Sequence, residues 1–284
     1  MPTRLPARLL LLGLALTVSG CLPYSYVPNH PHVTTVAAKG QVEVAATAST
    51  QPVDYGQAEL HIAAAPANRL LLTGHASLAG ANADRYEYFI FFGNSRSYYN
   101  LASRHLAAGL GLGTFGKLGA NATWYAQAGV DYARVSTEYR YGYRSPELDS
   151  GYVKAQGHFW VPWQQVSARF GLSQAGQWPR WSLVASLKAS QLVRNAYTYR
   201  TDVVNGEPLT TPEAFAPRPV HLVTQAMFGG ELALDMGLSL QATIALNNRQ
   251  NANRLVSYGF WQLGLGLAYC FGNRAAWAAQ TPPQ

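Results

Sequence analysis

Apolar and polar residues alternate with a period of two from residue 40 to residue 271. Successive side chains of a β-strand point to opposite faces, so the alternation predicts strands with one apolar face. The clearest strand places Trp261, Leu263, Leu265, Leu267, Tyr269 and Phe271 on one face and Gln262, Gly264, Gly266, Ala268 and Cys270 on the other. Ten such segments are predicted, at roughly 40–49, 56–65, 70–79, 104–115, 122–139, 151–172, 181–199, 220–235, 238–248 and 257–271.

The connections between these segments alternate in length. The short set is 66–69, 116–121, 173–180 and 236–237, and the long set is 50–55, 80–103, 140–150, 200–219 and 249–256. Short turns on one rim and long loops on the other are typical of transmembrane β-barrels. Most prolines fall in connections, because proline has no N–H to donate to the hydrogen bonds between strands. Pro162 is the exception, since it lies inside a predicted strand segment. A twelve-strand barrel is the alternative if Tyr86–Phe92 forms a strand and the chain turns at Pro162.

The apolar faces carry no Asp, Glu, Lys or Arg over the central ~9–11 residues that would cross a bilayer. A soluble sandwich or lipocalin-like barrel shows the same alternation with its apolar face in a core. Together with the connections, the pattern favours an all-β fold, a closed antiparallel up-and-down transmembrane β-barrel of about ten strands. The soluble periplasmic lipoprotein that binds a small ligand remains the alternative.

The first twenty residues have the order of a secretory signal peptide. Arg4 and Arg8 precede the apolar run Leu9–Leu16, which is shorter than the ~20 residues of a spanning helix. Val18-Ser19-Gly20-Cys21 resembles a bacterial lipobox, and the resemblance implies that Cys21 is lipidated and begins the mature chain. The alternative is an ordinary signal peptide with an incidental cysteine. Predicted domains are the signal peptide 1–20, a lipid-anchored tether 21–39, the barrel 40–271 and a C-terminal periplasmic tail 272–284.

Composition excludes several classes of protein. Of 284 residues, 12% are charged, half of the ~25% of an average soluble domain, which argues against a disordered chain. The net charge is +7, but Lys and Arg are scattered, so no nucleic-acid partner is expected. With Cys21 lipidated, Cys270 has no partner, and a disulfide framework is excluded.

Aromatic residues cluster at the ends of the predicted strands. Amphipathic rings are enriched where a barrel meets the lipid headgroups, so two girdles are predicted. One girdle holds Phe115, Trp124, Trp181, Tyr269 and Phe271, and the other holds Tyr132, Tyr139, Tyr197, Tyr258 and Trp261.

At this level the chain resembles the small outer-membrane β-barrel proteins of the OmpA/OmpX-like class, and in particular its lipobox-bearing single-barrel members. The most specific part is Gly264–Phe271, which resembles the aromatic-ended last strand that the barrel-assembly machinery recognises; residues 272–284 follow it here. The resemblance implies an outer-membrane location with the N-terminus anchored on the periplasmic side. It also implies three partners, namely outer-membrane lipids, the barrel-assembly machinery and the lipoprotein-sorting machinery. It implies no activity.

The inward faces are predicted to hold charged side chains. A salt-bridged network that fills the lumen is expected from Glu43, Asp131, Arg169, Lys188, Glu231 and Asp235. If one hairpin pairs His61 with His75, two imidazoles and Glu59 would lie together, which makes them weak candidates for a metal site. Paired polar lumen residues are the preferred interpretation, and no cofactor is expected.

No nucleophile elbow, phosphate loop, paired-histidine zinc motif or Cys-x-x-Cys occurs in the sequence. The predicted outer rim offers His105, Asp84, Asp149 and Asp202, without the pattern of the proteolytic ten-stranded barrels. We therefore expect a non-enzymatic barrel with a structural or surface-interaction role, and the sequence does not identify its surface ligand. A narrow pore for small solutes is the alternative.

Overall fold

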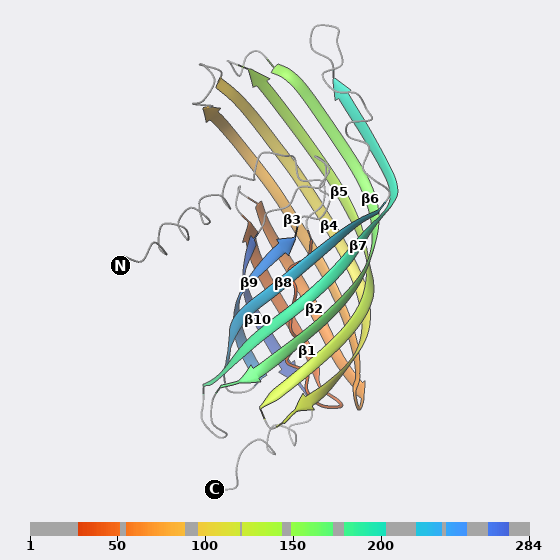
Figure 1. Ribbon diagram of the computed structural model, residues 1–284, viewed down its shortest axis with the longest axis vertical. Helices are drawn as coiled ribbons and strands as arrows, with labels where there is room; N and C mark the ends of the chain where they lie inside the picture. The colour runs from red at the N-terminus through yellow and green to blue at the C-terminus, as the bar shows by residue number, and fades with distance from the viewer. Residues whose placement is uncertain are drawn as a thin grey trace, which may run out of the picture.

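The computed structural model describes residues 28–51, 55–88, 96–119, 121–143, 149–172, 179–202, 220–234, 237–248 and 261–272. Nearly all of these residues lie in strands that wrap around one axis (Figure 1). The strands are β1 (Val42–Gln51), β2 (Tyr55–Ala67), β3 (Leu70–Tyr88), β4 (Arg96–Leu118), β5 (Ala122–Tyr143), β6 (Asp149–Gly171), β7 (Arg180–Asp202), β8 (Val220–Ala233), β9 (Leu238–Asn248) and β10 (Trp261–Phe271).

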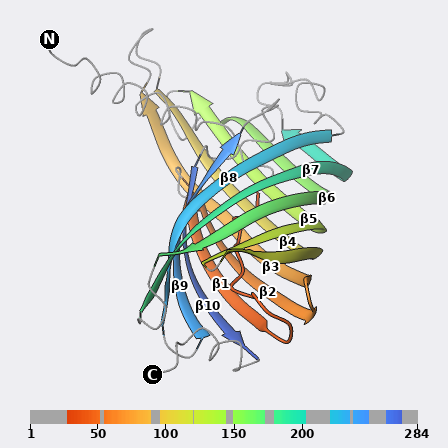
Figure 2. The same ribbon diagram turned by 60° about the horizontal axis from the view of Figure 1, so that its bottom comes forward.

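Within the described residues, the ten strands form a closed antiparallel barrel in which each strand pairs with its neighbours in sequence (Figure 2). The closing pair is β1 with β10, from Val42↔Phe271 to Thr50↔Leu263. At the level of the short strands, closure pairs every strand on both sides, whereas residues 82–88 of β3 pair only with β4 and residues 194–202 of β7 pair only with β6 within the described part. The predicted fold class is confirmed.

The twelve-strand alternative is wrong. Strand β3 continues without a turn through Tyr86 to Tyr88, and β6 passes through Pro162. Pro162 lies opposite Val130 of β5, whereas the register with β7 has no partner for Val161 or Pro162. The gap fits a residue that has no N–H to donate. Much of the predicted loop 80–103 is therefore strand, and residues 89–92 lie outside the described part.

The barrel wall has two heights. Strands β3 to β7 are 19 to 23 residues long, and the other five strands are 10 to 14 residues long. About 9–11 tilted residues cross a bilayer. The strands β3 to β7 therefore rise well above the rest of the wall at one rim (Figure 1).

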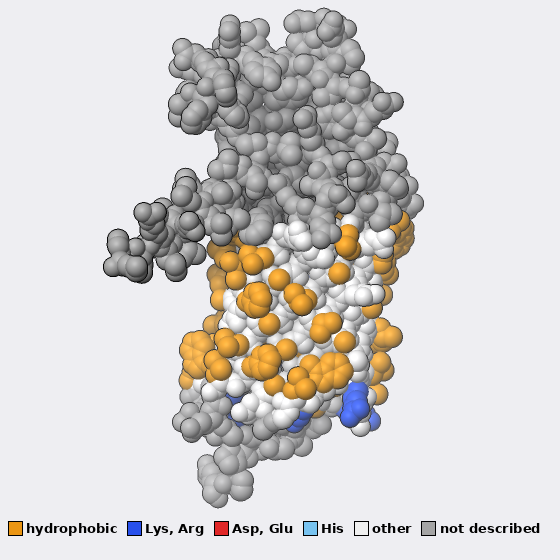
Figure 3. Space-filling model, viewed as in Figure 1, with side chains coloured by type: hydrophobic (Ala, Val, Ile, Leu, Met, Phe, Trp, Pro, Cys, Tyr) orange, Lys and Arg blue, Asp and Glu red, His pale blue; other side chains and the backbone are white. Residues whose placement is uncertain are grey.

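The apolar faces of the strands point outward. Leu110 is 73% exposed and Leu265 is 70% exposed, and they belong to a large set of exposed Leu, Ile, Val and aromatic side chains. On the face in Figure 3, apolar side chains cover the wall, and the coloured Lys and Arg side chains lie at its lower edge. This arrangement contradicts the alternative in which the apolar faces form a soluble core.

The predicted aromatic girdles are found in part. Trp181, Tyr269, Phe271 and Tyr132 point outward and are exposed, and the rings of Tyr269 and Phe271 stack. Trp124 and Trp261 are half-buried, and the side chains of Tyr139, Tyr197 and Tyr258 lie outside the described part.

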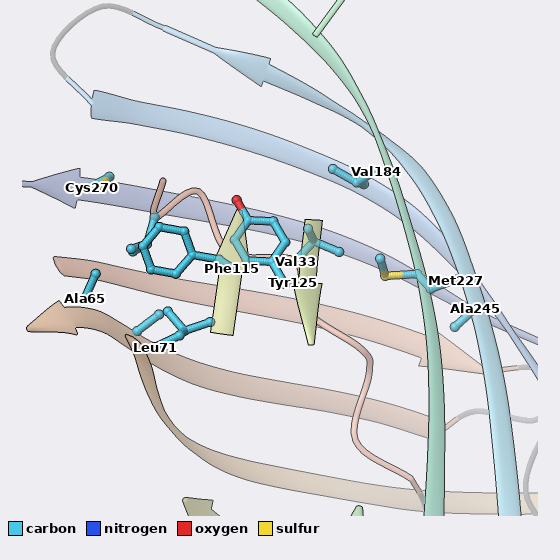
Figure 4. Packing of buried hydrophobic residues seen from close by; sticks show 11 residues of the cluster. Val33, Ala65, Leu71, Phe115, Tyr125, Val184, Met227, Ala245 and Cys270 are labelled. Carbon is cyan, nitrogen blue, oxygen red and sulfur yellow. The ribbon is translucent and has the colours of Figure 1, made fainter. Parts of the chain in front are cut away.

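Phe115 was expected in a girdle and instead points into the barrel. Its ring packs against Tyr125, with Leu71 and Val33 nearby (Figure 4). This apolar cluster lies in an interior that also holds many buried polar side chains. Among the described residues, no helix has the length and apolarity needed to cross a membrane.

Candidate functional site in the barrel lumen

The interior is occupied by residues 28–41, here called the lumen segment. It has no regular structure, and Asn29, His30 and Val33 are almost completely buried. The chain turns at Gly40, whose φ of 82° is the left-handed conformation that glycine tolerates, and the Gly40 N–H donates to Ala65 O over 2.7 Å. We expected residues 21–39 to be a tether outside the barrel. Its described part is extended, but it lies inside the barrel.

Asn29 joins three strands in the middle of the lumen. Its Nδ2 donates to His75 Nε2 over 2.7 Å and to Asp131 Oδ2 over 3.2 Å. Its Oδ1 accepts from Ser77 Oγ over 2.7 Å and from Gln57 Nε2 over 3.4 Å. All four hydrogen-bonding positions of the amide are therefore used.

His30 is held on both sides. Its backbone N–H donates to Glu59 Oε1 over 2.7 Å, and its Nε2 is hydrogen-bonded to Thr243 Oγ1 over 2.6 Å. A Cβ added at Gly264 would lie 2.6 Å from His30 Nε2. A glycine at that position in β10 therefore makes room for the ring.

The lower part of the segment surrounds Glu43. His32 Nε2 donates to Glu43 Oε1 over 2.7 Å, and the N–H and the hydroxyl of Thr35 both donate to Oε2 over 2.5 Å. Gln165 Nε2 and Gln241 Nε2 donate to the backbone carbonyls of His32 and Val33. Two glutamine side chains of the wall thus supply hydrogen bonds to backbone carbonyls of a segment that pairs with no strand.

The five described residues of the expected network form separate groups. Arg169 pairs with Glu231, with 2.7 Å between Nη2 and Oε1, and Lys188 Nζ lies 5.2 Å from the centre of the Trp163 ring. Glu43 and Asp131 are bound mainly by the lumen segment and by Trp163, whose Nε1 donates to Asp131 over 2.6 Å. Asp235 lies outside the described part.

The histidines form a stack. The register pairs His61 with His75, whose ring centres are 5.9 Å apart, and His32 stacks on His61 at 4.6 Å. His61 Nε2 donates to Glu59 over 2.9 Å. A cavity of about 40 Å³ beside the stack, near Trp163 and Lys188, has room for a few waters.

The histidine stack does not supply a metal site. In the described ranges, no group of three His, Cys, Asp or Glu has an arrangement that could hold a metal ion. The Nε2 atoms of His32 and His61 point to carboxylates, and His75 Nε2 lies 2.7 Å from Asn29 Nδ2 and 3.2 Å from Asp131 Oδ2.

Sequence reasoning did not select Asn29, His30, His32 or Trp163. A signal for the first three was present in the sequence. Asn29 and His30 lie between Pro28 and Pro31, and His32 follows Pro31, at positions where a tether in solvent would carry residues such as Ser or Lys. The indole of Trp163 lies over the paired glycines Gly111 and Gly129, which sequence periodicity does not connect.

His105, expected at the outer rim, is instead buried and faces the lumen. The side chains of Asp84, Asp149 and Asp202 lie outside the described part.

No protein-family model and no curated protein matches the sequence. Solved outer-membrane barrels are similar in fold. A major outer-membrane protein from Thermus thermophilus has a TM-score of 0.39 and 16% identity, over 82% of this chain and all of that one. The translocator domain of the autotransporter NalP from Neisseria meningitidis has a TM-score of 0.37 and 10% identity, over 93% of this chain and 95% of that one. An outer-membrane channel from Pseudomonas putida has a TM-score of 0.36 and 10% identity, over 86% of this chain and 100% of that one.

Proposed function

We propose that this chain is a non-enzymatic, lipid-anchored outer-membrane β-barrel whose lumen is closed by its own N-terminal segment. The observation that carries the proposal is the hydrogen bonding of Glu43, Glu59 and Asp131. Each of these buried wall carboxylates receives at least one hydrogen bond from residues 28–41. Without the segment, these buried carboxylates lose partners, which is costly in a polar but enclosed interior.

The outer face supports a membrane location. On β4 and β5 the exposed positions from Leu112 and Ala128 up to Leu106 and Tyr132 are apolar, and the next outward positions on those two strands are Arg104 and Arg134. A soluble protein rarely exposes so continuous an apolar surface. Connections at the rim where β1 begins are short, at 68–69, 119–121, 172–179 and 234–237, so this rim is assigned to the periplasm.

The lipid anchor rests on the lipobox at Cys21. Six residues, 22–27, separate Cys21 from Pro28, where the described part of the segment begins inside the lumen. Extended, they reach about 20–25 Å. Labelling cells with radioactive palmitate tests the anchor. Label should enter the native chain and be lost in Cys21→Ala, while Cys270→Ala keeps it; label that persists in Cys21→Ala would contradict the anchor.

The pore alternative requires movement of the lumen segment. The space beside the histidine stack is a cavity of about 40 Å³, and Asn29, His30 and His32 are fastened on opposite sides of the wall. We therefore expect the native protein to be closed in planar bilayers, and steady conductance would favour the pore.

The experiment that tests the membrane barrel is electrophoresis of outer-membrane extracts with and without boiling. A closed barrel should migrate differently before boiling and resist extraction with carbonate. Equal mobility, together with release as a water-soluble domain after removal of the lipid, would reject the proposal.

A further inference from the structure

Two arginines mark the upper edge of the apolar outer face. Arg104 of β4 and Arg134 of β5 point outward and are exposed. The register pairs Arg134 with Leu106, and Arg104 with Ser136, so the arginines are diagonal neighbours on adjacent strands. Such neighbours have Cα atoms roughly 7–8 Å apart, so two long side chains can reach one anion. Neither has an ion pair within the described ranges.

Polar and aromatic groups continue this edge onto β6. His158 lies opposite Arg134 in the register, and its Nδ1 accepts from the Tyr132 hydroxyl over 2.7 Å. The Tyr132 and Trp160 rings pack with centres 5.0 Å apart. Aromatic rings with a polar tip sit where a surface passes from hydrocarbon to headgroups. The nearest acidic side chain on this face of β5 is Glu138, two outward positions above Arg134.

A groove lies directly below these residues on the outer face. It has a volume of about 490 Å³ and is lined by Leu60, Ile62, Gly74, Ala76, Ala108 and Leu110, with Tyr132 and Trp160 beside the arginines. Small residues form its floor, and a Cβ added at Gly74 would already lie 3.4 Å from Leu110 Cδ2. The groove is therefore a shallow apolar channel with a cationic end.

We infer that this surface binds a phosphate-bearing anionic lipid of the membrane. The lipid belongs to the leaflet next to the rim at which the long strands rise above the rest of the wall. One acyl chain would lie in the groove, and the phosphate would be held by Arg104 and Arg134. Guanidinium groups form paired hydrogen bonds with phosphate, which a single ammonium does not match. Charge complementarity at one end and apolar complementarity along the channel both point to a lipid of this class. The inference rests on the proposed membrane location.

A second groove provides an internal comparison. It lies across β4 to β8 on the middle of the wall, has a volume of about 730 Å³ and is lined on its outer side by residues that include Leu112, Ala128, Val166 and Leu187. Neither groove has an arginine among its lining residues in the described part of the wall. The first groove lies directly below the exposed Arg104 and Arg134, whereas the only cation that lines the second is Lys188, which is buried on the lumen side. Apolar contact alone would favour this larger groove, whereas a phosphate-bearing lipid should favour the one below Arg104 and Arg134.

The test is native mass spectrometry of the full chain in maltoside micelles, with dioleoyl phosphatidylglycerol and dioleoylglycerol as probes. Phosphatidylglycerol should bind about tenfold or more tightly than dioleoylglycerol, because hydrogen bonds to charged groups contribute that much. Arg104→Gln with Arg134→Gln should remove this preference and leave dioleoylglycerol binding unchanged. Ala108→Leu, which fills the groove, should weaken binding of both lipids.

Matched controls are Lys117→Gln, an exposed cation at the opposite rim, and Ala128→Leu in the second groove. Both should bind phosphatidylglycerol like the native protein. The inference is overturned if the double arginine variant keeps the preference, or if Ala108→Leu and Ala128→Leu have equal effects.

Every variant is first checked for the mobility shift on boiling. If the double variant lacks the shift, Arg134→Gln alone is measured and should lose part of the preference. A native protein with the shift but no lipid preference rejects this inference alone, whereas a native protein without the shift rejects the proposed function.

Discussion

Asn29 donates a hydrogen bond of 3.2 Å to Asp131, a residue 102 positions later in the chain. Asn29 belongs to the lumen segment and Asp131 to strand β5 of the wall. Because Trp163 also donates to Asp131, over 2.6 Å, this carboxylate joins the segment to the two neighbouring strands β5 and β6. The barrel and its occupant are therefore one hydrogen-bonded unit.

Asn29→Ala should destabilise the barrel. It removes four hydrogen bonds and leaves Asp131, Ser77 and His75 with fewer partners, at a cost of about 1–3 kcal/mol. Urea unfolding of the refolded protein in detergent measures the change. Asn68→Ala, in the exposed β2–β3 turn, is the control and should be near neutral. Equal stability of the two variants would mean that the segment is not fastened at Asn29.

Thr35→Cys should form a disulfide with Cys270. The Thr35 hydroxyl donates to Glu43, and Glu43 lies opposite Cys270 in the β1–β10 register, so a sulfur at position 35 would lie near the Cys270 thiol. In a Cys21→Ser background, oxidation should give a cross-linked product that stays silent in planar bilayers. Asn68→Cys in the same background should not cross-link to Cys270. Conductance from the cross-linked protein would show that the lumen conducts with the segment in place.

Leu265→Arg should impair membrane assembly. Leu265 is 70% exposed in the middle of β10, and an arginine at the bilayer midplane of a barrel costs ~2–4 kcal/mol. The measurement is the yield of the heat-modifiable form in outer membranes. Asn68→Arg places the same charge at the rim and should assemble normally. Normal assembly of Leu265→Arg would contradict a lipid-facing β10.

Gly129→Ala should destabilise the barrel through overpacking. The added Cβ would lie 2.5 Å from Trp163 Cζ2, and crowding of this kind costs about 1–3 kcal/mol. Gly230→Ala is the control, because nothing lies within 4 Å of its added Cβ. Urea midpoints of the two variants should therefore differ. A Gly129→Ala protein as stable as Gly230→Ala would place the indole elsewhere.

Arg169→Leu should be strongly destabilising, because it leaves the buried Glu231 carboxylate without its cation. Loss of one partner of a buried pair costs about 3–5 kcal/mol. The double variant Arg169→Leu with Glu231→Leu should recover a substantial part of that loss. A double-mutant cycle of unfolding free energies measures the coupling, and purely additive effects would contradict an interacting pair.

The period-two alternation was enough to predict the strands and their apolar faces, whereas the outward direction of those faces also needed the alternating lengths of the connections. The pattern placed the β9 bounds correctly, and the pairing of His61 with His75, which the sequence left open, is found in the β2–β3 hairpin. It failed at the upper ends of β3 and β4, where strand continues through residues 80–88 and 96–103. Above a membrane, strand pairing does not require an apolar face, so the periodicity ends before the strand does.

The sequence by itself determined the barrel, because strand geometry and one apolar face per strand are local properties that each segment carries alone. Only the tertiary structure decided what fills the barrel. The partners of Asn29, His30 and Thr35 come from β1, β2, β3, β5 and β9, and these side chains converge only after the sheet has closed. The prolines of the N-terminal segment look the same in a free tether and in a lumen segment. What places the segment in the lumen is the set of buried wall carboxylates that need hydrogen-bond donors. These carboxylates become buried only when the barrel closes.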